Sequence, residues 1–350
     1  MAITKTHIAD FIELTTTAIV IDVRSPAEFA HAHFPNAYNI PLFSNEERAV
    51  VGTAYKQQSR EVAIKKGLDF FGPKMNQIID AVTAIKTLYP NKKNVLVYCW
   101  RGGMRSAGVA WLLDLYGFKV STLIGGYKAF RNWTLAQFNQ SYRFNIIGGY
   151  TGSGKTLLLQ RLQTANFSVI NLEALAHHKG SALGALGEAS QPSQEMFENK
   201  LATSLYENNK SQPIIFLEDE SQRIGKVQIP LGIWTQMRSQ TVFFFDIDFE
   251  VRLQYLTECY GVHPKDQLIA AILRIQKRLG GLETKNAINF IVENNCKESF
   301  RILLQYYDKW YFKGLYKRPN VNDVLITIPS NTVDSNENYI LLKNLLHEQY

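Results

Sequence analysis

The chain has 350 residues, of which 46% are hydrophobic and 20% charged, and its formal net charge is +7 at pH 7. This length exceeds an average domain, and no low-complexity tract interrupts it, so we expect two globular domains. No apolar run is long enough for a membrane span or a signal peptide, which predicts a cytoplasmic protein without a membrane partner. The three cysteines are widely separated, which argues against a disulfide framework or a zinc site.

The first predicted strand covers residues 18–23, a run rich in β-branched side chains. Ser25 follows as a helix N-cap, with proline at the first helical position and Glu28 three residues after the cap. This pattern predicts a strand that passes into a helix within two residues. Residues 45–71 are predicted to be helical and basic, either as a solvated helix face, which is our interpretation, or as a lid with a basic side. Residues 75–88 are predicted to form a periodic helix.

The stretch with the clearest chemistry is residues 95–106. An apolar strand ends at Cys99, a short glycine-containing loop follows, and a periodic helix begins after it. In such a loop the backbone N–H groups and the helix N-terminus hold an anion and stabilise a thiolate. We therefore predict a reactive Cys99 rather than a structural one, with Trp100, Arg101 and Arg105 as further catalytic candidates and the two arginines as counter-charges.

A third strand is predicted at residues 120–124, closed by a Gly-Gly turn before an aromatic-rich helix. The order of DVRSPAEF, HFPNAYNIP, the cysteine loop and this turn resembles a rhodanese domain, an α/β fold that handles sulfur. Two features depart from that family. Ala-His-Phe-Pro-Asn stands where Gly-His-Ile-Pro-Gly is usual, and five residues separate Cys99 from Arg105, one more than in typical sulfurtransferases. The longer spacing resembles the rhodanese-fold phosphatases, so a phosphatase is a second hypothesis.

Residues 144–156, FNIIGGYTGSGKT, match the phosphate-binding motif G-x-x-x-x-G-K-[ST] without a mismatch. A predicted strand precedes the motif and a predicted helix follows it, which is the context that the motif requires. Backbone amides of the loop and the lysine side chain should surround a phosphate, and the threonine hydroxyl can hold Mg²⁺. The candidate phosphate-binding residues are Gly149, Gly152, Ser153, Gly154, Lys155 and Thr156.

A carboxylate that completes a magnesium site should follow a later strand. Residues 213–217 form that predicted strand, and Glu218, Asp219 and Glu220 come directly after it. We expect one of the three to face the metal or its water shell, and Asp219 is the candidate ligand beside Thr156, although the sequence does not separate the three acids. Further strands alternate with helices in this half, which predicts a largely parallel sheet.

Two later segments leave alternatives open. Residues 177–192 are rich in Gly, Ala and Ser, which is typical either of a mobile loop over the phosphate site or of an ordinary surface connection. Residues 268–318 are predicted to be helical, with basic side chains among aromatic ones. Between residues 265 and 318 there are 11 basic and 5 acidic residues. Aromatic and basic neighbours suit RNA, but aromatics at helical spacing are more often core, which is our interpretation here.

The two halves together resemble the bacterial tRNA 2-selenouridine synthase family. The motifs that carry this resemblance are YCWRGGMRS in the first half and GGYTGSGKT, LEALAHHKGS and LEDESQRIG in the second. The expected architecture is α/β, with a rhodanese-like domain at residues 1–137, a linker at 138–143, and a P-loop domain at 144–350 that has a mostly parallel sheet and an added helical segment. Because the linker spans on the order of 20 Å when extended, we expect the domains to pack closely.

This resemblance implies a transferase that acts on the wobble uridine of tRNA. Its implied reaction is S-geranylation of 2-thiouridine from geranyl diphosphate, followed by replacement with selenium from selenophosphate to give 2-selenouridine. The P-loop and Lys155 would stabilise the leaving diphosphate, with Mg²⁺ as a candidate ion. The loop would bind selenophosphate, Cys99 would attack or carry selenium, and Trp100 would pack on the base or the prenyl chain.

The implied partners are tRNA, through its anticodon region, and a further candidate is the enzyme that supplies selenophosphate. Three other functions stay open at this point. They are an ATP-dependent tRNA sulfurtransferase, a rhodanese-fold phosphatase and a non-enzymatic RNA-binding module.

Overall fold

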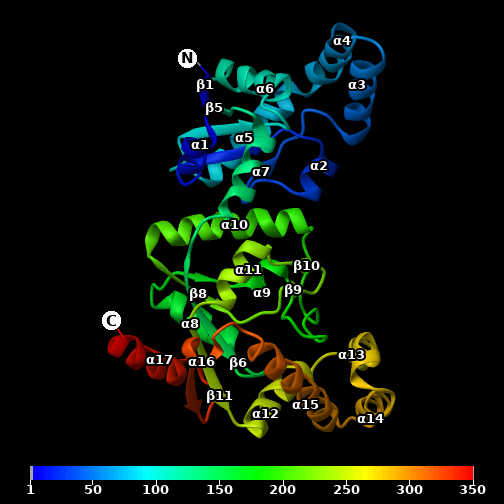
Figure 1. Ribbon diagram of the computed structural model, residues 1–350. Helices are drawn as coiled ribbons and strands as arrows, with labels where there is room; N and C mark the ends of the chain where they lie inside the picture. Colours follow the sequence, from blue (N-terminus) through cyan, green and yellow to red (C-terminus); the bar gives the residue numbers. More distant parts are fainter. Residues whose placement is uncertain (1–2, 350) are drawn as a thin grey trace. The chain divides into compact units, whose positions relative to one another are not determined.

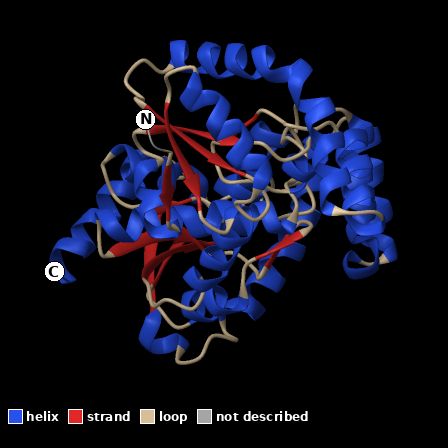
Figure 2. Ribbon diagram, turned by 90° about the horizontal axis from the view of Figure 1, so that it is seen from above, coloured by secondary structure: helices blue, strands red, loops and turns tan. Residues whose placement is uncertain are grey.

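The computed structural model describes residues 3–349 and divides the chain into two compact units, Met1–Ala136 and Gln137–Tyr350. Each unit is built around its own five-stranded sheet, and every strand pair in both sheets is parallel (Figure 1). Helices connect and flank the strands, as Figure 2 shows. The α/β class and the largely parallel sheet predicted from the sequence are therefore confirmed.

The sheet of the first unit has the strand order β1-β5-β4-β2-β3. Its strands are β1 (Thr4–Thr6), β2 (Ala18–Asp22), β3 (Tyr38–Asn39), β4 (Asn94–Tyr98) and β5 (Lys119–Leu123). Its helices are α1 (Ile8–Leu14), α2 (Pro26–His31), α3 (Asn45–Gln57), α4 (Arg60–Phe71), the 3-10 turn η1 (Gly72–Lys74), α5 (Met75–Leu88), α6 (Met104–Leu115) and α7 (Gly126–Gln137).

Local capping explains where two of these helices begin. Ser25 and Glu28 form the predicted capping box at the start of α2, so that β2 turns into a helix within a few residues. The predicted helical stretch 45–71 is interrupted, because the Ser59 hydroxyl accepts a hydrogen bond from the N–H of Val62 and starts α4 as a separate helix. The helical prediction for residues 45–71 is confirmed, with a short break between α3 and α4.

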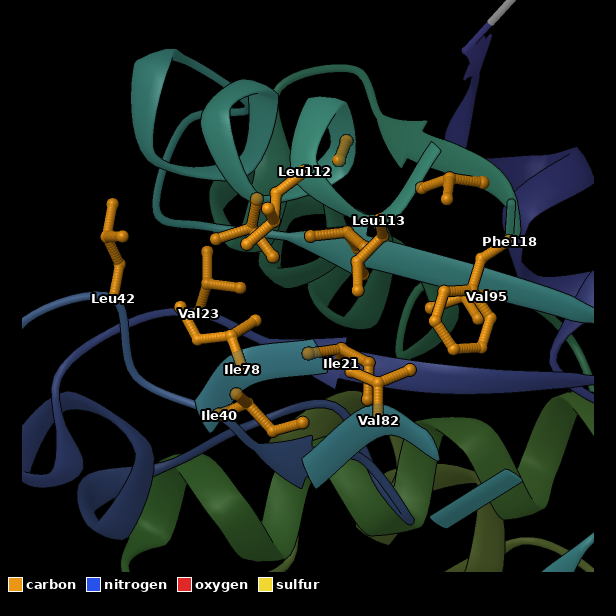
Figure 3. Packing of buried hydrophobic residues seen from close by; sticks show 14 of the residues in the cluster. Ile21, Val23, Ile40, Leu42, Ile78, Val82, Val95, Leu112, Leu113 and Phe118 are labelled. Carbon is orange, nitrogen blue, oxygen red and sulfur yellow. The ribbon is translucent and has the colours of Figure 1, made fainter. Parts of the chain in front are cut away.

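One face of this sheet packs against α5 and α6 (Figure 3). Ile21 and Val95 of the strands belong to the same buried cluster as Val82 of α5 and Leu113 of α6. Successive side chains of a strand point to opposite faces. Cys99 continues the alternation of β4 and also belongs to this cluster, so its side chain lies on the face that α6 covers.

The sheet of the second unit has the order β12-β11-β6-β8-β7. Its strands are β6 (Arg143–Gly149), β7 (Val169–Ile170), β8 (Ile214–Glu218), β11 (Val242–Ile247) and β12 (Leu325–Ser330), and β9 (Arg223–Ile224) with β10 (Val227–Gln228) forms a separate antiparallel pair. Its helices are α8 (Lys155–Thr164), α9 (Leu172–Ala176), α10 (Gln194–Ser211), α11 (Leu231–Arg238), α12 (Phe249–Tyr260), α13 (Lys265–Leu279), α14 (Gly281–Val292), α15 (Cys296–Leu315), α16 (Val321–Val324) and α17 (Ser335–Gln349).

Residues 268–318 are helical as predicted, and residues 177–192 are a segment for which the sequence left two alternatives open. The stretch 268–318 is divided among α13, α14 and α15, because Gly280 and the residues before Cys296 interrupt it. The stretch 177–192 carries Leu183 and Leu186, which are buried in the cluster formed by α12 to α15. These two buried leucines attach the segment to the helices, which favours the ordinary surface connection over a loop with little to pack.

Candidate active site

The cysteine loop occupies the end of β4 and the start of α6. Cys99 is 3% exposed, and its Sγ lies 3.2 Å from the Oγ of Ser106, the third residue of α6. The first-turn N–H groups of a helix have no acceptor within the helix and carry a partial positive charge. The thiol is therefore placed at a helix N-terminus, where a thiolate or an oxyanion is stabilised.

A close backbone contact holds this loop in place. The carbonyls of Cys99 and Trp100 accept hydrogen bonds of 2.8 and 3.0 Å from the N–H groups of Tyr127 and Lys128 at the start of α7. At Gly126 a Cβ would lie only 2.3 Å from the Cys99 carbonyl oxygen and 2.4 Å from the nitrogen of Gly102. The Gly-Gly turn predicted from the sequence thus serves to let the loop approach the first turn of α7.

A buried ion pair beside the loop was missed by the sequence analysis. Arg24 and Asp22 are 1% and 0% exposed, and the guanidinium also donates a hydrogen bond of 2.7 Å to the carbonyl of Ala32. The Arg24 guanidinium lies 3.9 Å from the ring centroid of Tyr127, whose N–H binds the Cys99 carbonyl. In the sequence, the only sign of this ion pair was an aspartate and an arginine on either side of Val23, at the end of the buried strand.

The three loop candidates have different environments. Trp100 is 41% exposed and its ring centroid lies 5.6 Å from that of Tyr127, while Arg101 is exposed. Arg105 instead donates hydrogen bonds of 2.8 and 3.3 Å to the carboxylate of Glu28. Burial opposes ionisation of Glu28, but the hydrogen bonds from Arg105 outweigh it and lower the pKa of that carboxyl. Arg105 is thus a fixed charge that is already partly neutralised.

The phosphate-binding motif forms the predicted loop between β6 and α8. Gly154 adopts a left-handed conformation with φ of 73° directly before α8, which an L side chain rarely accepts. The Nζ of Lys155 donates hydrogen bonds of 2.9 and 3.4 Å to the carbonyls of Gly149 and Tyr150. Ser153 Oγ is buried without a hydrogen-bond partner. The lysine therefore lies over the loop, where phosphate oxygens could replace the two carbonyls as its acceptors.

Asp219, the candidate metal ligand, has a different role in the structure. Its carboxylate forms a buried ion pair with Arg318 and accepts a 2.7 Å hydrogen bond from the hydroxyl of Tyr311. That hydroxyl in turn accepts a 3.1 Å hydrogen bond from the N–H of Gly149. Because both carboxylate oxygens are occupied by these partners, the geometry does not support Asp219 as a metal ligand. It joins the phosphate loop to α15 instead.

Three glutamates, Glu173, Glu218 and Glu220, lie near Thr156, where the phosphate loop passes into α8. The Thr156 hydroxyl donates a 2.9 Å hydrogen bond to Glu173, and the N–H of Glu173 donates one of 2.7 Å to Glu218. Burial, and then the charge of Glu173, raises the pKa of Glu218 to about 8, and the same two causes raise that of Glu220 well above its usual range. The Oε2 of Glu218 is buried without a partner. Glu218 and Glu220 therefore keep their protons to a higher pH than an ordinary glutamate.

The residues at this end fit a magnesium ion that is completed by substrate. Mg²⁺ is commonly held by one or two carboxylates together with phosphate oxygens and water. The Thr156 hydroxyl and the Glu173 carboxylate provide oxygen ligands of this kind. Across residues 3–349, no group of three or more His, Cys, Asp or Glu side chains is arranged to hold a metal. An ion here would thus depend on the substrate for its remaining ligands.

Helices α12 and α15 support the phosphate loop from outside the sheet. Arg252 of α12 donates a 3.1 Å hydrogen bond to the carbonyl of Thr151 and forms a two-bond ion pair of 2.8 and 2.9 Å with Asp308 of α15. The Tyr150 ring packs edge-on against Tyr311 at a centroid distance of 5.7 Å. One side of α15 is therefore part of the loop's framework.

The aromatic residues of α15 and the turn after it divide between two environments. The Tyr307 hydroxyl oxygen accepts a 2.8 Å hydrogen bond from the N–H of Ala182, and Tyr311 contacts the phosphate loop. Trp310, Phe312 and Tyr316 are instead 49%, 49% and 51% exposed. The interpretation of this aromatic segment as core was therefore right for the inner side only.

The fold and these two loops define a protein with a rhodanese-like domain and a P-loop domain in one chain. The rhodanese-like domain family matches residues 7–132, and the family described as tRNA 2-selenouridine synthase AAA domain matches residues 142–325. No helix within residues 3–349 is long and apolar enough to span a membrane.

Several curated relatives are similar over much of the chain. The tRNA 2-selenouridine synthase of Nitrosomonas europaea is 38% identical over 69% of this chain and 63% of its own length. The synthase of Nitrosomonas eutropha is 31% identical over 86% of this chain and 88% of its own, and that of a Sulfurovum species is 32% identical over 85% and 87%. The chain belongs to the tRNA 2-selenouridine synthase family.

Proposed function

We propose that this protein converts 2-thiouridine at the wobble position of tRNA into 2-selenouridine through an S-geranylated intermediate. One observation carries the proposal: a single chain of this family combines a thiol at a helix N-terminus, around Cys99, with a diphosphate-type loop, around Lys155. Selenophosphate and geranyl diphosphate are anions that suit these two loops.

In the first step, the thiocarbonyl sulfur attacks C1 of the geranyl group and the C1–O bond breaks. Diphosphate leaves with the electron pair, and the proton on N3 of the base is lost. The loop amides and Lys155 stabilise the charge that grows on the leaving diphosphate. Thr156 and Glu173 would hold Mg²⁺, which adds positive charge at the same oxygens when it is bound. The P-loop thus serves an alkyl transfer rather than nucleotide hydrolysis.

In the second step, selenium bonds to C2 of the base and the geranyl thiolate leaves. Arg101 is an exposed residue of the thiol loop, and the N-terminus of α6 also points at this loop. An incoming selenophosphate therefore meets positive charge there. The exposed Trp100 ring offers a surface on which the base or the prenyl chain can stack.

The outer side of α15 supports tRNA as the partner. Trp310, Phe312 and Tyr316 are each about half exposed, and each is next to a lysine in the sequence. No acidic residue occurs from residue 309 to 318. The exposed lysines are Lys309, Lys313 and Lys317. Exposed aromatic rings stack on unpaired bases and lysines neutralise phosphates, so we propose that this surface, called here the α15 outer surface, binds tRNA.

The test follows the nucleosides by mass spectrometry after incubation with 2-thiouridine tRNA, geranyl diphosphate and selenophosphate. We expect Lys155→Ala to lose geranylation, and Cys99→Ser to accumulate the geranylated nucleoside without selenouridine. Cys259→Ser, which changes an exposed cysteine, is the matched control. A Cys99→Ser protein that makes selenouridine at the normal rate contradicts the proposed role of the thiol.

The ATP-dependent sulfurtransferase is separated from this proposal by competition. If the P-loop binds the diphosphate of geranyl diphosphate, that compound should displace a bound nucleotide. Modification that requires ATP hydrolysis and ignores geranyl diphosphate would support the alternative.

A further inference from the structure

The thiol loop has the geometry of a site that acts on phosphorus. Five residues separate Cys99 from Arg105, and Ser106 follows with its Oγ 3.2 Å from the Cys99 Sγ. We infer that Cys99 cleaves the P–Se bond of selenophosphate by attacking phosphorus, forming a covalent phosphocysteine and releasing selenide inside the loop. This inference rests on the proposed function for the identity of the donor, and it assigns the chemistry of the thiol.

Electron balance favours phosphorus over selenium as the atom attacked. In selenophosphate, selenium is at the selenide level and phosphorus is fully oxidised. A thiolate that took up the selenium atom as a selenopersulfide would leave phosphorus reduced to phosphite, which cannot yield the inorganic phosphate expected from a phosphoryl donor. Attack at phosphorus changes no oxidation state. The S–P bond forms, the P–Se bond breaks, and the electron pair leaves on selenium, which keeps or acquires one proton as hydrogen selenide.

The remaining steps also balance without a further reductant. Water attacks the phosphocysteine, the S–P bond breaks, and inorganic phosphate and the Cys99 thiolate result. Hydrogen selenide then bonds to C2 of the geranylated base, and the geranyl thiolate leaves with the electron pair of the C2–S bond. The loop therefore supplies selenide where it is consumed, which limits its escape and oxidation in solution.

Ser106 is the positioning residue for this thiol. It is 1% exposed, and its hydroxyl donates a 3.1 Å hydrogen bond to the Gly103 carbonyl while its oxygen faces the Cys99 Sγ. The single hydroxyl proton has two acceptors within reach. When Cys99 is ionised, rotation of the hydroxyl toward Sγ stabilises the thiolate. The same donation helps the thiolate to leave when water cleaves phosphocysteine.

Arg105 can bind the phosphoryl group without breaking its ion pair with Glu28. A guanidinium has five N–H donors, and the two hydrogen bonds to Glu28 occupy one on each terminal nitrogen. The remaining donors are available to phosphoryl oxygens, and the ion pair fixes the orientation of the guanidinium plane. Glu28 is thus a positioning residue that keeps Arg105 in place at the edge of the loop.

The experiment uses the full chain with selenophosphate that carries a phosphorus radiolabel, without tRNA. Ser106→Ala should retain labelled phosphorus on Cys99 after an acid quench, because hydrolysis of phosphocysteine slows by about ten- to a hundred-fold when one hydrogen bond to a charged group is lost. Selenide should appear in proportion to the label. Ser106→Thr, which keeps a hydroxyl, should restore turnover, and Cys259→Ser should behave as the unchanged protein.

Mass alone does not separate the adducts, because a phosphoryl group and a selenium atom add nearly the same mass. The radiolabel and the isotope pattern of selenium distinguish them. Selenium without phosphorus on Cys99, phosphite as the product, or normal selenide release by Cys99→Ser would each overturn the inference. Release of neither phosphate nor selenide without tRNA would also overturn the inference. Labelled phosphocysteine in a protein that makes no selenouridine when tRNA and geranyl diphosphate are added would instead overturn the proposed function alone.

Discussion

Removal of one partner from the buried pair Asp22–Arg24 should destabilise the first unit and loosen the thiol loop. Asp22→Asn keeps the shape of the side chain but leaves the charge of Arg24, which is 1% exposed, without its counter-ion. Breaking such a pair by changing one partner costs about 3–5 kcal/mol. A domain of this size shifts its unfolding midpoint by roughly 3–5 °C for each kcal/mol, so we expect a decrease of about 9–25 °C for this unit.

The measurement has to resolve the first unit from the second, because we expect a chain of two compact units to depart from a single two-state transition. Hydrogen exchange read by mass spectrometry provides this, through a peptide that contains β4. Exchange in that peptide should accelerate in Asp22→Asn, while peptides from β6 stay unchanged. The rate of Cys99 alkylation should rise in parallel, because Arg24 packs on Tyr127 and the Tyr127 N–H holds the Cys99 carbonyl.

Two further variants test the reasoning. Replacement of both partners by apolar residues, Asp22→Leu with Arg24→Met, should recover much of the loss, because no buried charge is then left unpaired. Glu47→Gln removes the charge of one partner in the partly exposed ion pair with Lys74 and should cost less than about 1 kcal/mol. The reasoning is refuted if Asp22→Asn and Glu47→Gln show the same hydrogen-exchange rates in the β4 peptide and the same rate of Cys99 alkylation. The buried pair would then not support the thiol loop.

Three other predictions concern the turn, the carboxyl cluster and the tRNA surface. Gly126→Ala should abolish selenouridine formation in the nucleoside assay, because its Cβ would meet the Cys99 carbonyl, whereas Gly52→Ala, with nothing within 4 Å, should not. The pKa of Glu218 rises from 4.5 to about 8 on folding, so the folded state binds a proton that the unfolded state has lost, and stability falls as the pH increases between these values. Glu218→Gln should make this decrease smaller, as measured by thermal unfolding at a series of pH values. Lys313→Ala should weaken tRNA binding and reduce the slope of log affinity against log salt by about 0.7–0.9, and an equal loss in Lys343→Ala on α17 would contradict a specific α15 outer surface.

The sequence by itself determined the local elements and the two loops. The strand-to-helix passage at Ser25, the strand that ends at Cys99 and the P-loop at Gly149 each depend on residues within one short segment, through capping, alternation and glycine conformation. Such determinants act over a few positions along the chain, so a pattern is sufficient to locate them. The parallel sheets followed from the alternation of strands and helices.

Which side chains from distant segments contact one another could be learned only from the tertiary structure. Arg318 and Tyr311, which follow Asp219 by 99 and 92 positions, occupy its carboxylate, and the P-loop residue Thr156 contacts Glu173 instead. The same holds for Arg105, whose partner Glu28 is 77 positions away, and for the division of the α15 aromatics into an inner and an outer side. Contacts between distant segments depend on packing and desolvation in three dimensions. The spacing of residues along the chain does not show which of several acidic side chains will pair with a given basic one.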